Sequence, residues 1–289
     1  MSRGIVYVAS LAHSGSTLLD LLLGVHPQMV GLGEVSKVLD LDSDGVDENL
    51  HMACTCGQRA GECSFWGEFL TELKWLDGNS KKAKYEALIA HFYKQYDNSV
   101  QLVDSSKYRQ SIATITSIGD VQLRVLHLIK DVRSFCLSHR RSTLPELEIQ
   151  RLPKLLNSEA LSLWLYGHTI KAPSYLFWKW FLRNRSLIRY LDESELSFTS
   201  VSYDQLAKDP QHSMGKIFSF LELEPLNSSN LVPAQSKSHI FLGNPMIGDS
   251  EKLSAVRYDD RWQQDDDWRL AADIYGAIMD FNQKMVYPQ

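Results

Sequence analysis

The stretch that decides the fold is "GIVYVAS" at residues 4–10, followed by "LAHSGSTLLDLLLG" at residues 11–24. The first part is rich in Val, Ile and Tyr, which is typical of a buried parallel strand. The second part begins as a loop of small polar residues and continues as an apolar helical pattern, which Pro27 stops. A strand, a polar loop and a helix in this order favour phosphate binding, because the loop and the first helical turn direct N–H groups at an anion.

This loop matches the P-loop of nucleotide triphosphatases only in part. When Gly15 and Thr17 are aligned with G-x-x-x-x-G-K-[ST], Ser10 replaces the first glycine and Ser16 replaces the lysine. Two of the four fixed residues are therefore absent. An ordinary turn that caps a helix is the structural alternative, and the strand before the loop favours phosphate binding over it.

Further strands are predicted at 99–106 and 123–131, and a fourth begins at 197, with helical patterns between them. Strands that alternate with helices predict an α/β fold with a central parallel sheet covered on both faces. We expect one domain over residues 1–289, with a cysteine-bearing insert at about 40–80 and an aromatic, helical section at about 158–191, divided by Pro173. Polar loops follow the first three strands, and ligands of such folds bind at the carboxyl ends of the strands.

The composition limits the class of protein. The chain has 289 residues, of which 44% are hydrophobic, and its net charge is -5. This charge argues against broad binding of nucleic acid, so a bound anion must be held by a local basic site. The sequence contains no apolar run long enough for a transmembrane segment and no recognisable signal peptide, so we expect a cytoplasmic protein.

Three of the four cysteines, Cys54, Cys56 and Cys63, form a group near His51. Together they could hold zinc, but the single residue between Cys54 and Cys56 does not fit a common zinc finger. Reduced thiols that pack a loop, or a local disulfide, are the favoured alternatives. The sequence therefore predicts no metal site.

A second basic group follows the third strand, in "KDVRSFCLSHRRS" at 130–142. Lys130 and Arg133 at the strand end favour a second phosphate, with Ser138 two helical turns further on. The alternative for this group is a solvated helix face with an ion pair to Asp131, and for Arg140 and Arg141 it is equally favoured.

Two separate phosphate sites suit a nucleotide that is phosphorylated at both its 5′ and 3′ positions. Here the chain resembles the sulfotransferases that use 3′-phosphoadenosine 5′-phosphosulfate, especially their bacterial members. The resemblance covers almost the whole chain, in the right order. It is carried by five motifs: "HSGSTL" (13–18), "CTCGQRAGECSFW" (54–66), "KDVRSFCLS" (130–138), "VSYDQLAKDP" (201–210) and "HIFLGNPM" (239–246). Two residues depart from the family pattern. His13 stands where Arg or Lys is usual, and Lys130 stands where Arg is usual.

The resemblance implies a P-loop-like sulfotransferase fold and a nucleotide site. Its first part would hold the 5′-phosphosulfate and its second part the 3′-phosphate, and no metal is required. The implied nucleotide-binding residues are His13, Ser14, Gly15, Ser16, Thr17, Leu18, Lys130, Arg133, Ser138, Tyr203 and Asn244.

The resemblance also implies catalytic roles. Lys107 would reach the transferring sulfuryl oxygens, with Ser105 and Ser106 as further donors. Glu34 would be the general base, as in the protein-tyrosine sulfotransferase branch; the alternatives are an ion pair with Lys37, and His13 as the base. A protonated His13 would make activity fall as the pH rises.

The acceptor is expected to be a hydroxyl, or an amine, of a small molecule or glycan. Aromatic residues at 161–181 could wall its site or could simply be core. A nucleotide kinase and a non-catalytic nucleotide-binding relative are the alternative functions, and a homodimer is possible.

Overall fold

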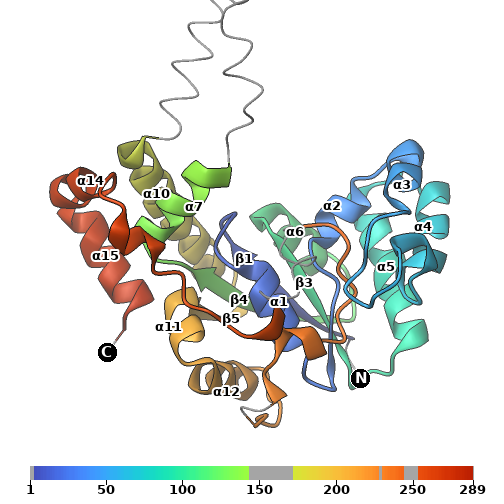
Figure 1. Cartoon of the computed structure of the whole chain (residues 1–289). Helices are drawn as coiled ribbons and strands as arrows, with labels where there is room; N and C mark the ends of the chain where they lie inside the picture. Colours follow the sequence, from blue (N-terminus) through green and yellow to red (C-terminus); the bar gives the residue numbers. More distant parts are fainter. Residues whose placement is uncertain (1–2, 143–171, 228–229, 244–252, 289) are drawn as a thin grey trace, which may run out of the picture.

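The computed structural model of the chain describes residues 3–142, 172–227, 230–243 and 253–288. Five parallel strands form one sheet in the order β2-β3-β1-β4-β5 (Figure 1). The predicted α/β fold with a parallel sheet is confirmed. The strands are β1 (Arg3–Ser10), β2 (Met29–Gly31), β3 (Gln101–Lys107), β4 (Val121–Ile129) and β5 (Ser197–Ser202).

Helices connect the strands and surround the sheet (Figure 1). Those before β4 are α1 (Ser16–Leu23), α2 (Val35–Leu39), α3 (Ser43–Asn49), the 3-10 turn η1 (Ala60–Glu62), α4 (Trp66–Trp75), α5 (Lys81–Gln95) and α6 (Arg109–Thr116). Those after β4 are α7 (Val132–Ser142), α10 (Pro173–Glu193), α11 (Tyr203–Lys208), α12 (Pro210–Phe220), η4 (Pro233–Gln235), η6 (Arg261–Gln264), α14 (Arg269–Ile274) and α15 (Gly276–Val286).

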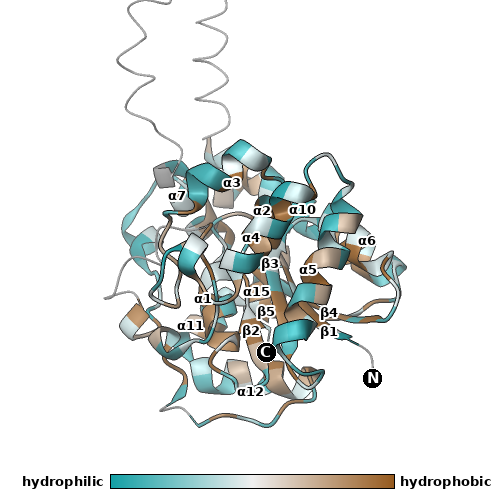
Figure 2. Cartoon of the chain, turned by 90° about the vertical axis from the view of Figure 1, so that its right-hand side faces the viewer, coloured by the Kyte–Doolittle hydropathy of each residue, from teal (hydrophilic) through white to brown (hydrophobic). Residues whose placement is uncertain are grey.

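Both faces of the sheet are buried. Ile5 and Tyr7 of β1 belong to a core cluster with side chains of α4 and α5. Val6 and Val8 point to the opposite face and pack with side chains of α1 and α12. Successive residues of a strand face opposite sides, so a strand covered on both sides is apolar throughout, as "IVYV" is. Figure 2 shows the same distribution, with hydrophobic strands inside more hydrophilic helices.

A third core cluster joins α7, α10, α14 and α15. Phe177 and Trp180 of α10 are fully buried in it, whereas Tyr175 and Trp178 are partly exposed. Where the structure describes it, the aromatic section is therefore partly core and partly exposed. Its first part, with Trp164 and Tyr166, lies outside the described residues.

Several boundaries differ from the prediction. The short strand β2 was not predicted, because three residues carry no readable periodicity. The helix expected to run on from Tyr203 is split into α11 and α12 at Pro210, since proline has no N–H for the preceding turn. The last helix, expected at about 267–286, is split into α14 and α15 before Gly276.

The register of the central strands places three strand ends together. Ser10 at the end of β1 pairs with Leu128 of β4, two residues before Lys130. On the other side, Ala9 pairs with Lys107, the last residue of β3, after a shift in register. The loop that follows β1 therefore begins between the two lysines that the sequence assigned to the site.

None of the helices in the described ranges is long and apolar enough to cross a bilayer.

Candidate nucleotide and transfer site

The loop after β1 leads directly into α1, and its backbone is shaped by two left-handed residues. Gly15 is the N-cap of α1 with φ 92°, and no side chain caps the helix. His13 has φ 65°, a conformation that costs a residue with a Cβ atom about 1 kcal/mol or more. Because Gly15 has no side chain to cap them, the first N–H groups of α1 can donate to a ligand. Such a helix N-terminus is a favourable place for a phosphate.

The ring of Tyr203 packs against this loop. A Cβ atom at Gly15 would lie 2.3 Å from Cδ2 of Tyr203, so only glycine fits. The ammonium group of Lys130 lies 4.7 Å from the centroid of the same ring, and its Nζ donates to Oγ of Ser138 at 3.1 Å. These contacts bring the loop, the end of β4 and the start of α11 together.

Positive charge converges on His13. Its ring centroid is 5.5 Å from that of His139, and Lys179 of α10 is 2.9 Å from Nε2 of His139. Burial lowers the pKa of His13, and the nearby His139, Lys107, Lys130 and Lys179 lower it further, to about 4. The imidazole is therefore neutral near pH 7, and the expectation of a protonated His13 does not fit these surroundings. A cluster of cations that repel one another is suited to an anionic ligand.

Lys107 and Glu34 form a buried ion pair beside this cluster. Nζ of Lys107 is 2.6 Å from Oε1 of Glu34, and Nζ of Lys37 is 2.8 Å from Oε2. Burial alone would raise the pKa of Glu34, but the charges and hydrogen bonds of the two lysines lower it. Lys107 has φ 78°, so the strand end is held in an unfavourable conformation that aims its side chain at the carboxylate.

Asp20 of α1 anchors the segment that carries Glu34. Oδ2 of the buried Asp20 accepts from the N–H of Gly33 at 3.1 Å, and the carbonyl of Gly33 accepts from the N–H of Ser105 at 2.8 Å. Burial raises the pKa of Asp20 to about 7. The position of Glu34 thus depends on α1, the helix that follows the loop at residues 11–15.

Arg133 is held mainly by its own helix start. Its guanidinium makes two hydrogen bonds to the buried Asp131, at 3.0 and 2.7 Å, and stacks 3.8 Å from the ring centroid of Trp262. Lys130 has an acidic partner as well, because its Nζ lies 3.5 Å from Oδ2 of Asp259. Both basic residues of the predicted 3′-phosphate site are therefore paired with carboxylates in this structure.

The other predicted residues take different places. Ser14, Ser16 and Thr17 are buried in the loop and first turn of α1, and the side chain of Leu18 belongs to the core. Oγ of Ser106 bonds to Asp104 and accepts from the N–H of Ser36 at 2.7 Å. Arg140 pairs with Asp267. Asn244 and the side chain of Arg141 lie outside the described residues.

His139, Lys179 and Asp259 were missed. Adjacent residues of a helix do not share a face, so the position of His139 directly after Ser138 did not predict that its ring would lie 5.5 Å from that of His13. Lys179 and Asp259 reach the site from α10 and from the segment before η6, and no local pattern announces such distant contacts.

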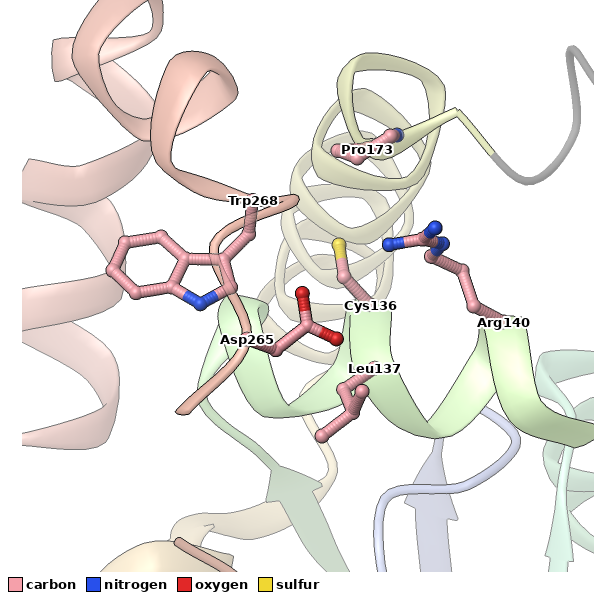
Figure 3. A pocket seen from close by; sticks show the side chains of 6 residues that line it. All are labelled: Cys136, Leu137, Arg140, Pro173, Asp265 and Trp268. Carbon is pink, nitrogen blue, oxygen red and sulfur yellow. The ribbon is translucent and has the colours of Figure 1, made fainter. Parts of the chain in front are cut away.

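A small pocket lies apart from these groups. It is formed between α7, the start of α10 and the segment before α14 (Figure 3). Arg140 of the second basic group lines it, and none of the implied nucleotide-binding or catalytic residues that the structure describes does. We assign it no part in the site. The lining residues are Cys136, Leu137, Arg140, Pro173, Asp265 and Trp268.

Comparison with known proteins supports the fold. No family model matches the chain, and no curated protein matches its sequence. Two solved structures match with TM-scores of 0.50, and both are sulfotransferase domains. That of the Synechococcus PCC 7002 olefin synthase is 17% identical, and the match covers 95% of each chain. That of the curacin biosynthetic pathway is 16% identical, and the match covers 95% of this chain and 98% of the other. The protein therefore has the sulfotransferase fold.

Proposed function

We propose that the protein is a sulfotransferase that moves a sulfuryl group from 3′-phosphoadenosine 5′-phosphosulfate to an acceptor hydroxyl. The observation that supports this most is the group of basic side chains around the loop before α1: His139 contacts His13, Lys179 contacts His139, and Lys130 lies over the ring of Tyr203, which packs on Gly15. A helix N-terminus and several cations around one loop suit a ligand with several anionic groups. The sulfotransferase fold favours a phosphosulfate over other nucleotides.

In this proposal, the loop and the N–H groups at the start of α1 hold the 5′-phosphosulfate. Lys130 and Ser138, which already share a hydrogen bond of 3.1 Å, hold the 3′-phosphate. Binding of the phosphate would replace the contact of 3.5 Å between Lys130 and Asp259. The 3′-phosphate then gains a buried, charge-assisted partner.

The transfer step uses the pair of Glu34 and Lys107. The acceptor oxygen attacks sulfur in line, Glu34 takes the hydroxyl proton, and the bond between sulfur and the 5′-phosphate oxygen breaks. The products are a sulfate ester and 3′,5′-ADP. Lys107, 2.6 Å from Oε1 of Glu34, is near enough to stabilise the charge on the sulfuryl oxygens. Because its lowered pKa keeps Glu34 ionised near pH 7, the carboxylate is ready to accept the proton.

Calorimetric binding of 3′,5′-ADP tests the nucleotide site, with ATP and magnesium as the comparison. We expect Lys130→Ala and Ser138→Ala to weaken 3′,5′-ADP binding, the former by roughly 10- to 100-fold, since a charged hydrogen bond is lost. Lys94→Ala is the matched control, because Lys94 is an exposed lysine whose Nζ lies 2.9 Å from Oε1 of Glu68. Magnesium-dependent ATP binding without 3′,5′-ADP binding would move the protein to the phosphotransferases.

Tight 3′,5′-ADP binding without any sulfuryl transfer would instead indicate a non-catalytic relative. A small-molecule or glycan acceptor, a cytoplasmic location and a homodimer stay predictions.

A further inference from the structure

Three thiols and one imidazole converge at a point that the transfer site does not use. Sγ of Cys63 lies 3.7 Å from Sγ of Cys54, 3.6 Å from Sγ of Cys56 and 3.2 Å from Nδ1 of His239. All four ligand atoms lie within 4.8 Å of one another. His239 is 176 residues from Cys63 in the sequence, and it takes the place that the sequence suggested for His51.

These distances fit a metal ion better than a disulfide. A disulfide requires about 2.0 Å between sulfurs. A tetrahedral zinc ion with bonds of about 2.3 Å to sulfur places its sulfur ligands about 3.8 Å apart. The observed separations of 3.6 and 3.7 Å are close to this edge of a tetrahedron.

Neighbouring groups contact Cys63 and His239 in the way that is usual around metal ligands. The N–H of Trp66 points at Sγ of Cys63 from 3.5 Å. The second ring nitrogen of His239, Nε2, is 3.2 Å from the hydroxyl of Tyr96. Metal-ligating histidines usually have such a partner on their other nitrogen, which fixes the ring and its tautomer. Cys54, Cys63 and His239 are buried and Cys56 is exposed, so the site is partly shielded from water.

The cluster joins two distant segments. The turn that begins at Cys54 closes with Gly57 at φ 89°, and the N–H of Thr55 donates to the carbonyl of Ile240 at 2.9 Å. The N–H of His239 donates to the carbonyl of Gly31 at 2.6 Å, at the end of β2. Ile240 packs so closely on Gly33 that a Cβ atom there would lie 2.7 Å from it. Gly33 directly precedes Glu34.

We propose that Cys54, Cys56, Cys63 and His239 bind a structural zinc ion that clamps the cysteine-bearing insert to the segment at 238–241. Three thiolates and an imidazole without an open position are typical of structural zinc rather than of magnesium or calcium. The ion stabilises the edge of the sheet behind Glu34 and takes no part in sulfuryl transfer.

Metal analysis of the full, untagged chain, purified from zinc-supplemented cells under reducing conditions, tests the proposal. We expect about one zinc per chain. Cobalt(II) in its place should give the charge-transfer absorption of thiolate ligands and the bands of tetrahedral cobalt. Cys63→Ser and His239→Asn should lose the metal, and Tyr96→Phe should weaken its retention against a chelator by roughly 10-fold.

Two matched controls should keep the metal. Cys136→Ser removes a buried cysteine that lies outside the cluster, and His51→Ala removes the histidine nearest in sequence. If a ligand variant fails to fold, titration of the wild-type thiols with a mercurial, which should release the zinc as the cluster cysteines react, still decides the point. A metal-free wild type that takes up no cobalt, a disulfide within the cluster, or zinc retained in both ligand variants would overturn the proposal.

Discussion

The imidazole of His13 lies among four other basic side chains, and burial and these charges hold its pKa at about 4. A phosphate beside the ring would remove part of this repulsion and raise the pKa, by one to three units for a close opposite charge. We therefore expect 3′,5′-ADP binding near pH 6 to take up a fraction of a proton. Calorimetry in two buffers of different ionisation enthalpy measures this uptake directly.

His13→Gln should abolish that uptake, while His212→Gln, which removes an exposed histidine of α12, should leave it unchanged. Equal uptake in both variants would assign the proton to another group.

Glu34 is the residue whose chemistry can be separated from its packing. Both of its oxygens are held by lysines, so Glu34→Gln keeps the size of the side chain and removes the basic site. We expect hydrolysis of 3′-phosphoadenosine 5′-phosphosulfate, with water as the acceptor, to fall by roughly 100-fold or more. The affinity for 3′,5′-ADP should change only a few-fold, because the carboxylate does not contact the nucleotide in this proposal.

Lys37→Gln is the control for Glu34, since it breaks one ion pair but keeps the carboxylate. Equal losses of hydrolysis in the two variants would mean that Glu34 serves only to hold the lysines in place.

At the scale of the elements, the connection between β1 and α1 depends on one close contact. Gly15 has φ 92°, and the ring of Tyr203 occupies the place of its missing side chain. Gly15→Ala should therefore lower the free energy of unfolding through backbone strain, and by about 1–3 kcal/mol more through the clash with the ring. It should also weaken 3′,5′-ADP binding, because the loop that holds the 5′-phosphate in the proposed function is displaced.

Gly78→Ala is the matched control for this change. Gly78 has a similar φ of 77°, but a Cβ atom there would meet nothing within 4 Å. Urea unfolding of the two variants separates the strain from the clash. Equal destabilisation would show that Tyr203 yields without cost and does not brace the loop.

The elements also show how far the sequence could predict this fold and site. The buried strand, the polar loop and α1 lie within 24 residues, so local patterns were enough to predict them. Lys130 was assigned to the site because it stands at a strand end, where ligands of such sheets bind, whereas the role of Lys107 was implied by the family resemblance. Lys179 and His239 reach their sites from distant segments, and only packing of the whole chain brings them there. The contact of Arg133 with Asp131 is the ion pair that the sequence left open as an alternative to phosphate binding by this basic group.

At the scale of the whole molecule, the sheet and α1 bury ionisable groups whose effects on stability oppose one another. His127 of β4 lies fully buried between Ser200 and Asn184, and burial lowers its pKa from 6.5 to about 4. Burial raises the pKa of Asp20 from 3.8 to about 7. The folded state therefore resists protonation of His127 and resists ionisation of Asp20.

These two pKa shifts make the free energy of unfolding change with pH in opposite directions. The unfolded chain binds a proton at His127 below about pH 6.5, which the folded chain does only near pH 4, so acidification through this window destabilises the protein. The unfolded chain ionises Asp20 above about pH 4, which the folded chain does only near pH 7, so acidification from pH 7 towards pH 4 stabilises it. Between pH 4 and 6.5 the two effects offset each other, each on the order of 3 kcal/mol.

Single substitutions should therefore reveal each pH dependence of the free energy of unfolding, because the two offset each other in the wild type. Relative to the wild type, His127→Gln should gain unfolding free energy as the pH falls from about 7 to about 5, because only the contribution of Asp20 remains of the pair. Asp20→Asn should lose unfolding free energy over the same range. Urea unfolding at several pH values measures both, and His212→Gln, an exposed histidine, should follow the wild type. Parallel pH profiles for all four proteins would contradict the argument, because they would mean that neither buried group changes its protonation in this range.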